Sequence, residues 1–195
     1  HTVHLGKFTN TTGLYGAVNS TANPTVQNYE KKKEPHFGGR TVLEHHFNAG
    51  SSLIEWSAGM EFQKGNFHYN TYKNVAGKPD SLRIEDKLEV QQFTAFAQAA
   101  WHYQNWMISA GASINRLQFD FRRRSTTATI HEQKQFSGEF VPRFAVLYKI
   151  SKTVAAYVNI ANGFSPPAAD EIFADNNSYN LALAAEKGWN YRSEE

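Results

Sequence analysis

The amino-acid sequence predicts an all-β fold, an antiparallel meander of about seven or eight strands with short turns at one end and long loops at the other. Three observations support this prediction. Apolar and polar residues alternate with a period of two in most segments, helical periodicity is scarce, and the connections between segments are short and long in turn. A period of two is the pattern of a strand with two different faces.

Residues 54–63 show the alternation most clearly, because every second residue is apolar and the intervening residues are polar or glycine. In two strands the apolar parity changes near the far end, at Phe67 and Tyr69 in one strand and over residues 117–121 in the other. A β-bulge would produce such a change. The same alternation recurs in five further segments, residues 37–47, 93–103, 108–115, 140–150 and 154–160.

The connections sort by length. Short connections are expected at residues 48–51, 104–106 and 151–152, and long polar loops at residues 9–35, 75–88, 123–135 and 166–186. In a meander, alternating short and long connections place all the short turns at one end of the sheet. Outer-membrane barrels have this layout, whereas a soluble sandwich has no reason to sort its loops by end.

Composition limits the possible functions. Among the 195 residues, Lys and Arg exceed Asp and Glu by only two, so nothing indicates a nucleic-acid partner. Cysteine is absent, and no apolar stretch is long enough for a membrane-spanning helix. The chain is rich in aromatic residues, at 14%, yet its mean hydropathy is −0.56. A membrane β-barrel can combine these properties, because half of each strand faces a wet interior.

Two alternatives remain open at this stage. One is a soluble antiparallel barrel or sandwich acting as a binding module, and the other is a complete small outer-membrane barrel of eight strands. Aromatic residues near strand ends favour a membrane barrel, where such residues form belts at the two interfaces. They are Trp56, Phe67, Tyr69, Trp101, Tyr103, Trp106, Phe119, Phe121, Tyr148 and Phe164.

The last third of the chain resembles TonB-dependent outer-membrane receptors. In that family a barrel strand ends in Gly-Phe-Arg-x-Pro, and Glu-Leu-Tyr or a similar triplet follows. The chain has Ser165 in place of the Arg, Ala185 in place of a later Pro, and Arg192 in place of a strand Glu. The residues that match in kind and spacing are Gly163, Phe164, Pro167, Glu171, Ile172, Phe173, Leu183, Glu186, Asn190 and Tyr191.

This resemblance implies a 22-stranded transmembrane barrel closed by an N-terminal plug, in the outer membrane of a Gram-negative bacterium. Such receptors import a ferric siderophore, haem or a similar scarce nutrient, energised by the TonB–ExbB–ExbD complex. Because both ends of the chain fall in mid-pattern, residues 1–195 are expected to be a partial barrel domain without the plug and the C-terminal strands. Outer-membrane lipid and a small iron chelate are the further partners implied.

Four residues are candidates for contact with the transported ligand: His46, His68, His131 and Tyr179. For the histidines the plainer interpretations are a polar wall residue, packing at a membrane interface and a solvated loop. Glu44 and His46 share a strand face, but two local ligands fall short of the four that a structural zinc site needs, so no metal site is predicted. No covalently bound cofactor is implied.

Catalytic motifs are absent from the sequence. It contains no nucleophile elbow, no phosphate-binding loop and no His-Glu-x-x-His. The protein is therefore not expected to be an enzyme.

Overall fold

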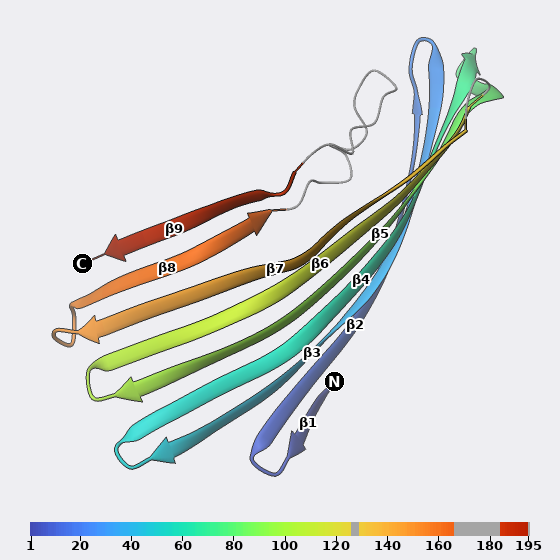
Figure 1. The fold of residues 1–195 in the computed structure, drawn as a ribbon. Helices are drawn as coiled ribbons and strands as arrows, with labels where there is room; N and C mark the ends of the chain where they lie inside the picture. Colours follow the sequence, from blue (N-terminus) through green and yellow to red (C-terminus); the bar gives the residue numbers. More distant parts are fainter. Residues whose placement is uncertain (126–128, 166–183, 195) are drawn as a thin grey trace.

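A computed structural model describes residues 1–125, 129–165 and 184–194. All strands in these ranges form one antiparallel sheet in chain order, a single curved and strongly twisted layer (Figure 1). The predicted all-β meander is therefore confirmed, with nine described strands in place of seven or eight. They are β1 (Thr2–Leu5), β2 (Phe8–Pro24), β3 (Asn28–Ala49), β4 (Ser52–Val75), β5 (Lys78–Tyr103), β6 (Trp106–Ser125), β7 (Thr129–Lys149), β8 (Ala155–Ser165) and β9 (Glu186–Glu194).

The sheet has two ends, which we name by their connections. The turn end carries the connections at residues 6–7, 50–51, 104–105 and 150–154, and the tip end carries those at 25–27 and 76–77 (Figure 1). At the tip of β4 and β5, Ala76 and Gly77 both have positive φ, as a two-residue type I′ hairpin turn requires. Both ends therefore have short connections, of two to five residues, at these positions.

The three long loops expected at residues 9–35, 75–88 and 123–135 are largely strand instead. The ladder of β2 and β3 continues to Pro24 and Tyr29, and that of β4 and β5 to Val75 and Lys78. The outer part of the β2–β3 hairpin is polar on both faces, so the alternation that marks a strand is lost there although the backbone pairing continues. Most of the fourth loop, residues 166–186, lies outside the described residues.

The two faces of the sheet differ in burial. We call inner the face that carries Ser57 and Gln98, and outer the face that carries Met60 and Ala97. All the buried side chains in the described ranges point to the inner face, whereas most exposed large apolar side chains point to the outer face. The inner face is therefore the concave side of the curved sheet. The side chains buried there are Ser57, Asp86, Leu88, Leu117, Phe119, Phe121 and Arg123.

An apolar span crosses the outer face in the half of the sheet nearer the turn end. On β5 it runs from Phe93 to Tyr103, eleven residues, and on β6 from Trp106 to Ile114, nine residues. A transmembrane strand needs about 9–11 residues. Aromatic side chains lie at both ends of the span, as the interface belts of a barrel would. They are Trp101, Tyr103, Trp106 and Tyr148 at the turn end and Phe37, Phe62, Phe93 and Phe140 at the other.

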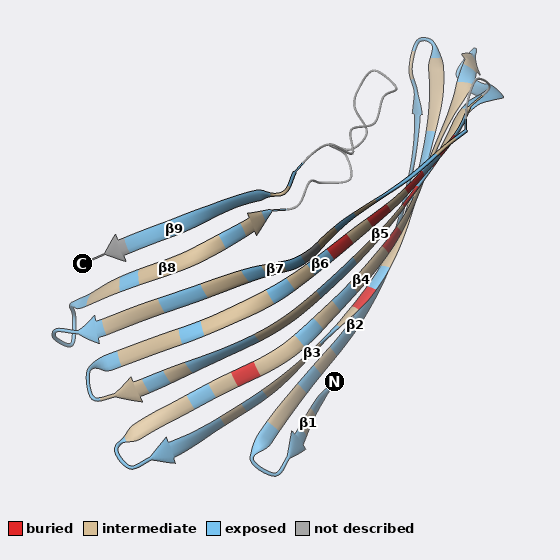
Figure 2. Cartoon of the chain, viewed as in Figure 1, coloured by how far each residue is buried: buried red, intermediate tan, exposed pale blue. Residues whose placement is uncertain are grey.

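The aromatic residues expected at the far interface on β4 and β6 lie elsewhere. Phe119 and Phe121 are buried with Leu88 and Leu117 in a cluster on the inner face, against Phe67. Most of the buried positions lie in the tip half of the sheet (Figure 2). The bulges predicted on β4 and β6 do not occur at these residues, because β4 pairs with β5 without a register shift from residue 52 to 71, and β5 pairs with β6 without one from residue 84 to 103. The inner face itself changes from polar to apolar toward the tips, which alternation alone cannot distinguish from a bulge.

A register shift does occur between β6 and β7, directly before Leu117 where the apolar parity changes, but the extra residue lies on β7 and not on β6. One extra β7 residue lies between the partners of Asn115 and Leu117, beside Gly138 with its positive φ of 74°. As a result Phe140 points outward while Phe136 points into the inner cluster. The bulge therefore allows one strand to place Phe136 in the inner cluster and Phe140 on the apolar outer face.

The observed sheet does not match either alternative fold. A sandwich needs a second sheet, and the described strands form only one. A closed eight-stranded barrel needs its first and last strands to pair, but β1 pairs with β2 alone and β9 with β8 alone in the ranges described. No helix there is long and apolar enough to cross a membrane.

Gly59 on β4 provides a test of the inner-face packing. A Cβ atom there would lie 2.5 Å from the Thr41 carbonyl oxygen and 2.7 Å from the Phe96 ring. We expect Gly59→Ala to lower the free energy of unfolding by about 1–3 kcal/mol, because the backbone must shift. Urea unfolding of the full-length protein measures this. Gly13→Ala is the control, because no atom lies within 4 Å of its added methyl group. An equal loss of unfolding free energy in both variants would refute the close packing around Gly59.

Candidate functional site: the polar inner wall and the outer polar network

The inner face near the turn end is a polar wall. Glu55 and His102 lie on neighbouring strands, and the His102 Nε2 atom is 2.9 Å from Glu55 Oε2. A hollow of about 460 Å³ opens beside them. Its inner-face lining includes Glu44, His46, Glu55, Ser57, Gln98 and Arg143. This wall can hold polar groups or water, because it offers both signs of charge and several hydrogen-bonding groups.

A second polar group lies farther toward the tips on the same face. Arg40 Nη1 is 3.6 Å from Glu61 Oε2, and Tyr15 donates its hydroxyl hydrogen to Glu61 over 3.2 Å. The Arg40 guanidinium also lies over the Phe96 ring, 4.9 Å from its centroid. The Arg40 side chain is 54% exposed, so its charge faces open space on the concave side. Arg40 lies in the alternating segment at residues 37–47, but a single sequence could not show these partners.

The aromatic cluster and a buried ion pair lie on the inner face of the tip half. Asp86 on β5 and Arg123 on β6 are register partners. Arg123 donates from Nε to Asp86 Oδ1 over 2.8 Å and from Nη2 to Asp86 Oδ2 over 2.7 Å. Their side chains are 7% and 10% exposed. Beyond them, Tyr69 donates to Glu34 over 2.9 Å while Lys32 lies over the Tyr69 ring.

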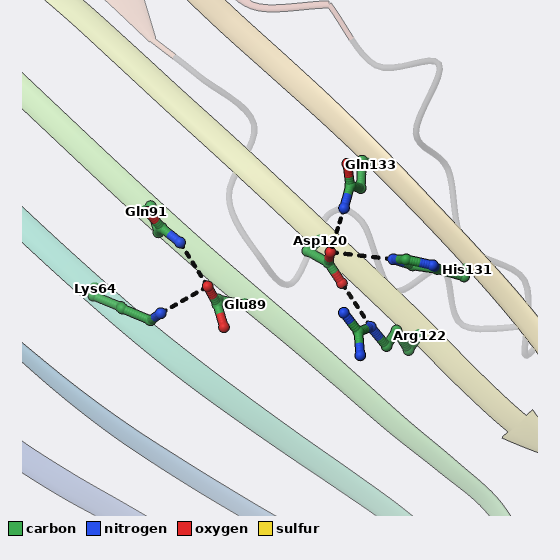
Figure 3. A network of polar contacts seen from close by, with 7 residues as sticks. All are labelled: Lys64, Glu89, Gln91, Asp120, Arg122, His131 and Gln133. Atoms are coloured by element: carbon green, nitrogen blue, oxygen red, sulfur yellow. Dashed lines mark hydrogen bonds and ion pairs between the residues drawn. The ribbon is translucent and has the colours of Figure 1, made fainter.

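The outer face of the tip half carries a polar network across four strands (Figure 3). Glu89 accepts hydrogen bonds from Lys64 over 2.7 Å and from Gln91 over 2.6 Å. These two donors stabilise the ionised carboxylate, so the pKa of Glu89 lies below its ordinary value of 4.5.

Asp120 is the centre of the second part of this network (Figure 3). Its carboxylate accepts from Arg122 over 3.0 Å, from His131 over 3.1 Å and from Gln133 over 2.6 Å. Burial by itself would raise the pKa of Asp120. The hydrogen bonds from His131, Arg122 and Gln133 outweigh that effect and hold the pKa below the ordinary value of 3.8.

These lowered pKa values predict a loss of stability in acid. The unfolded chain binds protons at Glu89 and Asp120 more readily than the folded chain, so the contribution is complete above about pH 5 and falls as the pH drops through the folded pKa values. We expect a loss of about 1 kcal/mol or less, because both groups are partly exposed. Urea midpoints measured between neutral pH and about pH 3 should fall less in an Asp120→Asn/Glu89→Gln variant. If the urea midpoint fell equally in the native protein and the variant, the acid sensitivity could not be assigned to these two carboxylates.

Only part of the Gly-Phe motif lies within the described residues. Gly163 and Phe164 end β8, where they pair with Gly188 and Lys187 of β9. Glu186, Asn190 and Tyr191 all lie on β9, opposite Ser165, Ala161 and Ile160. The motif therefore flanks a connection between two neighbouring antiparallel strands at the tip end. The remaining motif residues, Pro167, Glu171, Ile172, Phe173 and Leu183, lie outside the described ranges.

The candidate ligand residues are not brought together. His46 lies on the inner wall near the turn end, whereas His68 and His131 lie on the outer face of the tip half. Tyr179 lies outside the described residues. Ligand contact by any of them stays a prediction. Within the parts of the chain that are described, no group of three or more histidines and carboxylates could hold a metal ion.

Comparison with known proteins identifies the family. The model of the TonB dependent receptor-like β-barrel matches residues 2–192, almost the whole chain. The protein therefore belongs to the TonB-dependent receptor β-barrel family, whose members are receptors and transporters and not enzymes. No curated protein matches the chain.

Solved structures of this family have the same fold. The ferric yersiniabactin uptake receptor FyuA from Yersinia pestis matches 98% of the chain with a TM-score of 0.69 at 12% identity. The ferric citrate transporter FecA matches 80% with a TM-score of 0.65 at 14% identity, and the ferric preacinetobactin receptor BauA from Acinetobacter baumannii matches 95% with 0.54 at 13%. The chain spans 31%, 24% and 31% of these structures, so it corresponds to a part of such a barrel.

Proposed function

We propose that the protein is an outer-membrane receptor that takes up a ferric siderophore or a similar iron chelate with energy delivered by TonB, ExbB and ExbD. The observation that carries the proposal is the division of one sheet into two faces. The outer face has an apolar span of 9–11 residues with aromatic ends, and the inner face opposite it is polar. Lipid on one side and a wet interior on the other require this arrangement.

The strands continue far beyond the apolar span. β5 has 26 residues, of which only the eleven from Phe93 to Tyr103 belong to the span. The rest forms polar hairpins that would stand clear of the bilayer on the extracellular side. We infer that these hairpins and the inner wall form the entry path for the chelate, and that a plug outside this chain would fill the interior and contact TonB.

The polar group around Asn10 lies within the outer span and is compatible with lipid contact. Asn10 donates to Thr41 Oγ1 over 3.0 Å and to the Val42 carbonyl oxygen over 3.2 Å, and Thr12 donates to Asn10 Oδ1 over 3.0 Å. Backbone and side-chain polar groups facing lipid must be satisfied within the protein, and these are. The group therefore does not count against the proposed orientation.

The FyuA, FecA and BauA structures support an iron chelate as the substrate class, because all three are named for ferric ligands. Uptake of radioactive iron tests the proposal in a strain that lacks its own ferric siderophore receptors and expresses the full-length protein. We expect uptake from at least one ferric siderophore, and we expect it to disappear when TonB is deleted. Uptake that persists without TonB would refute the energy source, and uptake from haem alone would refute the siderophore class.

A further inference from the structure

The seam between the β2–β3 hairpin and the β4–β5 hairpin is interrupted well below the tips. β3 pairs with β4 from Ala49 to His36 and again from Lys33 to Asn28. Pro35 lies between these two runs and has no backbone N–H to donate to a ladder. The outermost part of the seam is therefore a separate short ladder of six residue pairs. A short exposed ladder opens first at its two ends, so the contacts at those ends decide whether the hairpins stay together.

Tyr69 on β4 fastens the lower end of this short ladder. Its hydroxyl donates a hydrogen bond to Glu34 Oε1 on β3 over 2.9 Å, directly beside Pro35. The ammonium group of Lys32 lies over the same ring, 5.2 Å from its centroid. These side-chain contacts join β3 to β4 at the point where the backbone ladder is interrupted.

Asn74 on β4 fastens the upper end, because it bonds to the turns of both hairpins. Its amide N–H donates to the Gln27 carbonyl oxygen over 3.2 Å, and its side-chain Nδ2 donates to the Thr25 carbonyl oxygen over 2.6 Å. Its Oδ1 accepts from the N–H of Gly77, in the turn of its own hairpin, over 2.9 Å. Asn74 is half-buried although both of its sequence neighbours are exposed. It is therefore packed between the two turns and does not project into solvent.

Arg83 on β5 adds a second connection from the far strand of the β4–β5 hairpin. The pairing of β4 with β5 shifts register directly after Thr71, and Arg83 is the extra residue on β5. A bulge of this kind re-aims a side chain. Arg83 Nη1 donates to Asn28 Oδ1 on β3 over 2.8 Å, although β4 lies between their two strands.

We propose that Asn74 and Arg83 form a clamp that joins the tips of the two hairpins into one rigid unit, and that this unit is a fixed part of the mouth of the entry path. It keeps its position when the path is empty and when a ferric chelate enters, so a movement that admits the chelate arises elsewhere on the rim. The inference rests on the proposed function, because that function places the tips outside the membrane and supplies the chelate. The clamp itself depends only on contacts among Thr25, Asn28, Asn74 and Arg83.

Spin labels on Ala22→Cys and Leu82→Cys in the full-length protein measure the distance between the two hairpins. Both positions are exposed and lie outside the clamp, and three strand spacings, about 14 Å, separate their strands. Double electron–electron resonance in bilayers should give a single narrow distribution of distances. Adding Asn74→Ala/Arg83→Ala should widen that distribution about twofold or more, because the short ladder can then fray from its upper end.

Asn19→Ala/Arg122→Ala is the matched control, because it removes the same two kinds of side chain. Asn19 donates to Glu34 within the β2–β3 hairpin, and Arg122 donates to Asp120 within β6, so neither bond joins the two turns. The distribution of distances should stay as narrow in this control as in the native protein. A clamp variant that keeps the narrow distribution, or a control that widens equally, would overturn the clamp.

A second pair of labels tests whether the clamped unit stays fixed. Ala22→Cys lies on the tip half, and Ala97→Cys lies on the apolar outer span. Ferric citrate, ferric yersiniabactin and a ferric catecholate are each added at saturating concentration. The distance should not change with the chelate that the protein takes up, and a shift larger than the width of the distribution would overturn the fixed mouth.

Failure of the proposed function would look different. If the full-length protein took up no ferric chelate, the proposed function would fail and the fixed mouth would fail with it. The comparison of the clamp variant with its control needs no chelate and would still decide whether the clamp exists. Normal uptake together with an unchanged distribution in the clamp variant would refute only the inference.

Discussion

Replacing Asp86 with alanine should lower the free energy of unfolding by about 3–5 kcal/mol. The carboxylate accepts two short hydrogen bonds from Arg123, and both side chains are almost fully buried beside the Phe119–Phe121 cluster. Without the carboxylate, the guanidinium charge keeps its burial cost and loses the partner that offsets it. Equilibrium unfolding of the full-length protein in urea measures the loss.

Glu85→Ala is the matched control for this prediction. Glu85 is the neighbouring residue on the outer face, and its carboxylate is 3.0 Å from Lys87 with both side chains partly exposed. An exposed pair of this kind contributes about 0–1 kcal/mol. The double variant Asp86→Leu/Arg123→Met should recover most of the stability, because it removes both buried charges. If Asp86→Ala costs no more than Glu85→Ala, the ion pair does not hold the two hairpins together.

The strands of the apolar span were predictable because lipid and the wet interior impose opposite demands on adjacent residues. Over residues 54–63 the two demands give an unbroken alternation, and over residues 93–103 only Phe96 and Ala100 interrupt it, so both the strands and their orientation could be predicted. Toward the tip of the β2–β3 hairpin, both faces carry polar residues and the demand for alternation ends. Residues 9–35 therefore look like a loop although they form most of a ladder.

Other features depend on the pairing register between strands, which cannot be read from a single sequence. Phe67 and Phe119 seemed to continue the outer apolar set after a slip, yet they lie on the inner face because the concave tip half has a small core of its own. Asp86 and Arg123 are 37 residues apart in the chain, and so no local pattern connects them.

The orientation of the whole sheet depends on which face contacts lipid. Arginine substitutions at Ala97 and Gln98, adjacent residues on opposite faces, test this orientation. Ala97 lies in the middle of the outer span on β5, between Ala58 and Ala112, whereas Gln98 points to the inner wall between Ser57 and Gly111. An arginine at the bilayer midplane on the lipid face costs about 2–4 kcal/mol. We therefore expect Ala97→Arg to lower the free energy of unfolding from bilayers by about that amount.

Gln98→Arg should change the same free energy far less, because the inner wall already carries charged side chains and accepts water. Both variants add the same side chain to the same strand, so strand propensity and chain composition are matched. Comparing them in bilayers isolates the difference between the two faces. A larger loss for Gln98→Arg would reverse the assignment of lipid and interior, and with it the extracellular tips and the entry path.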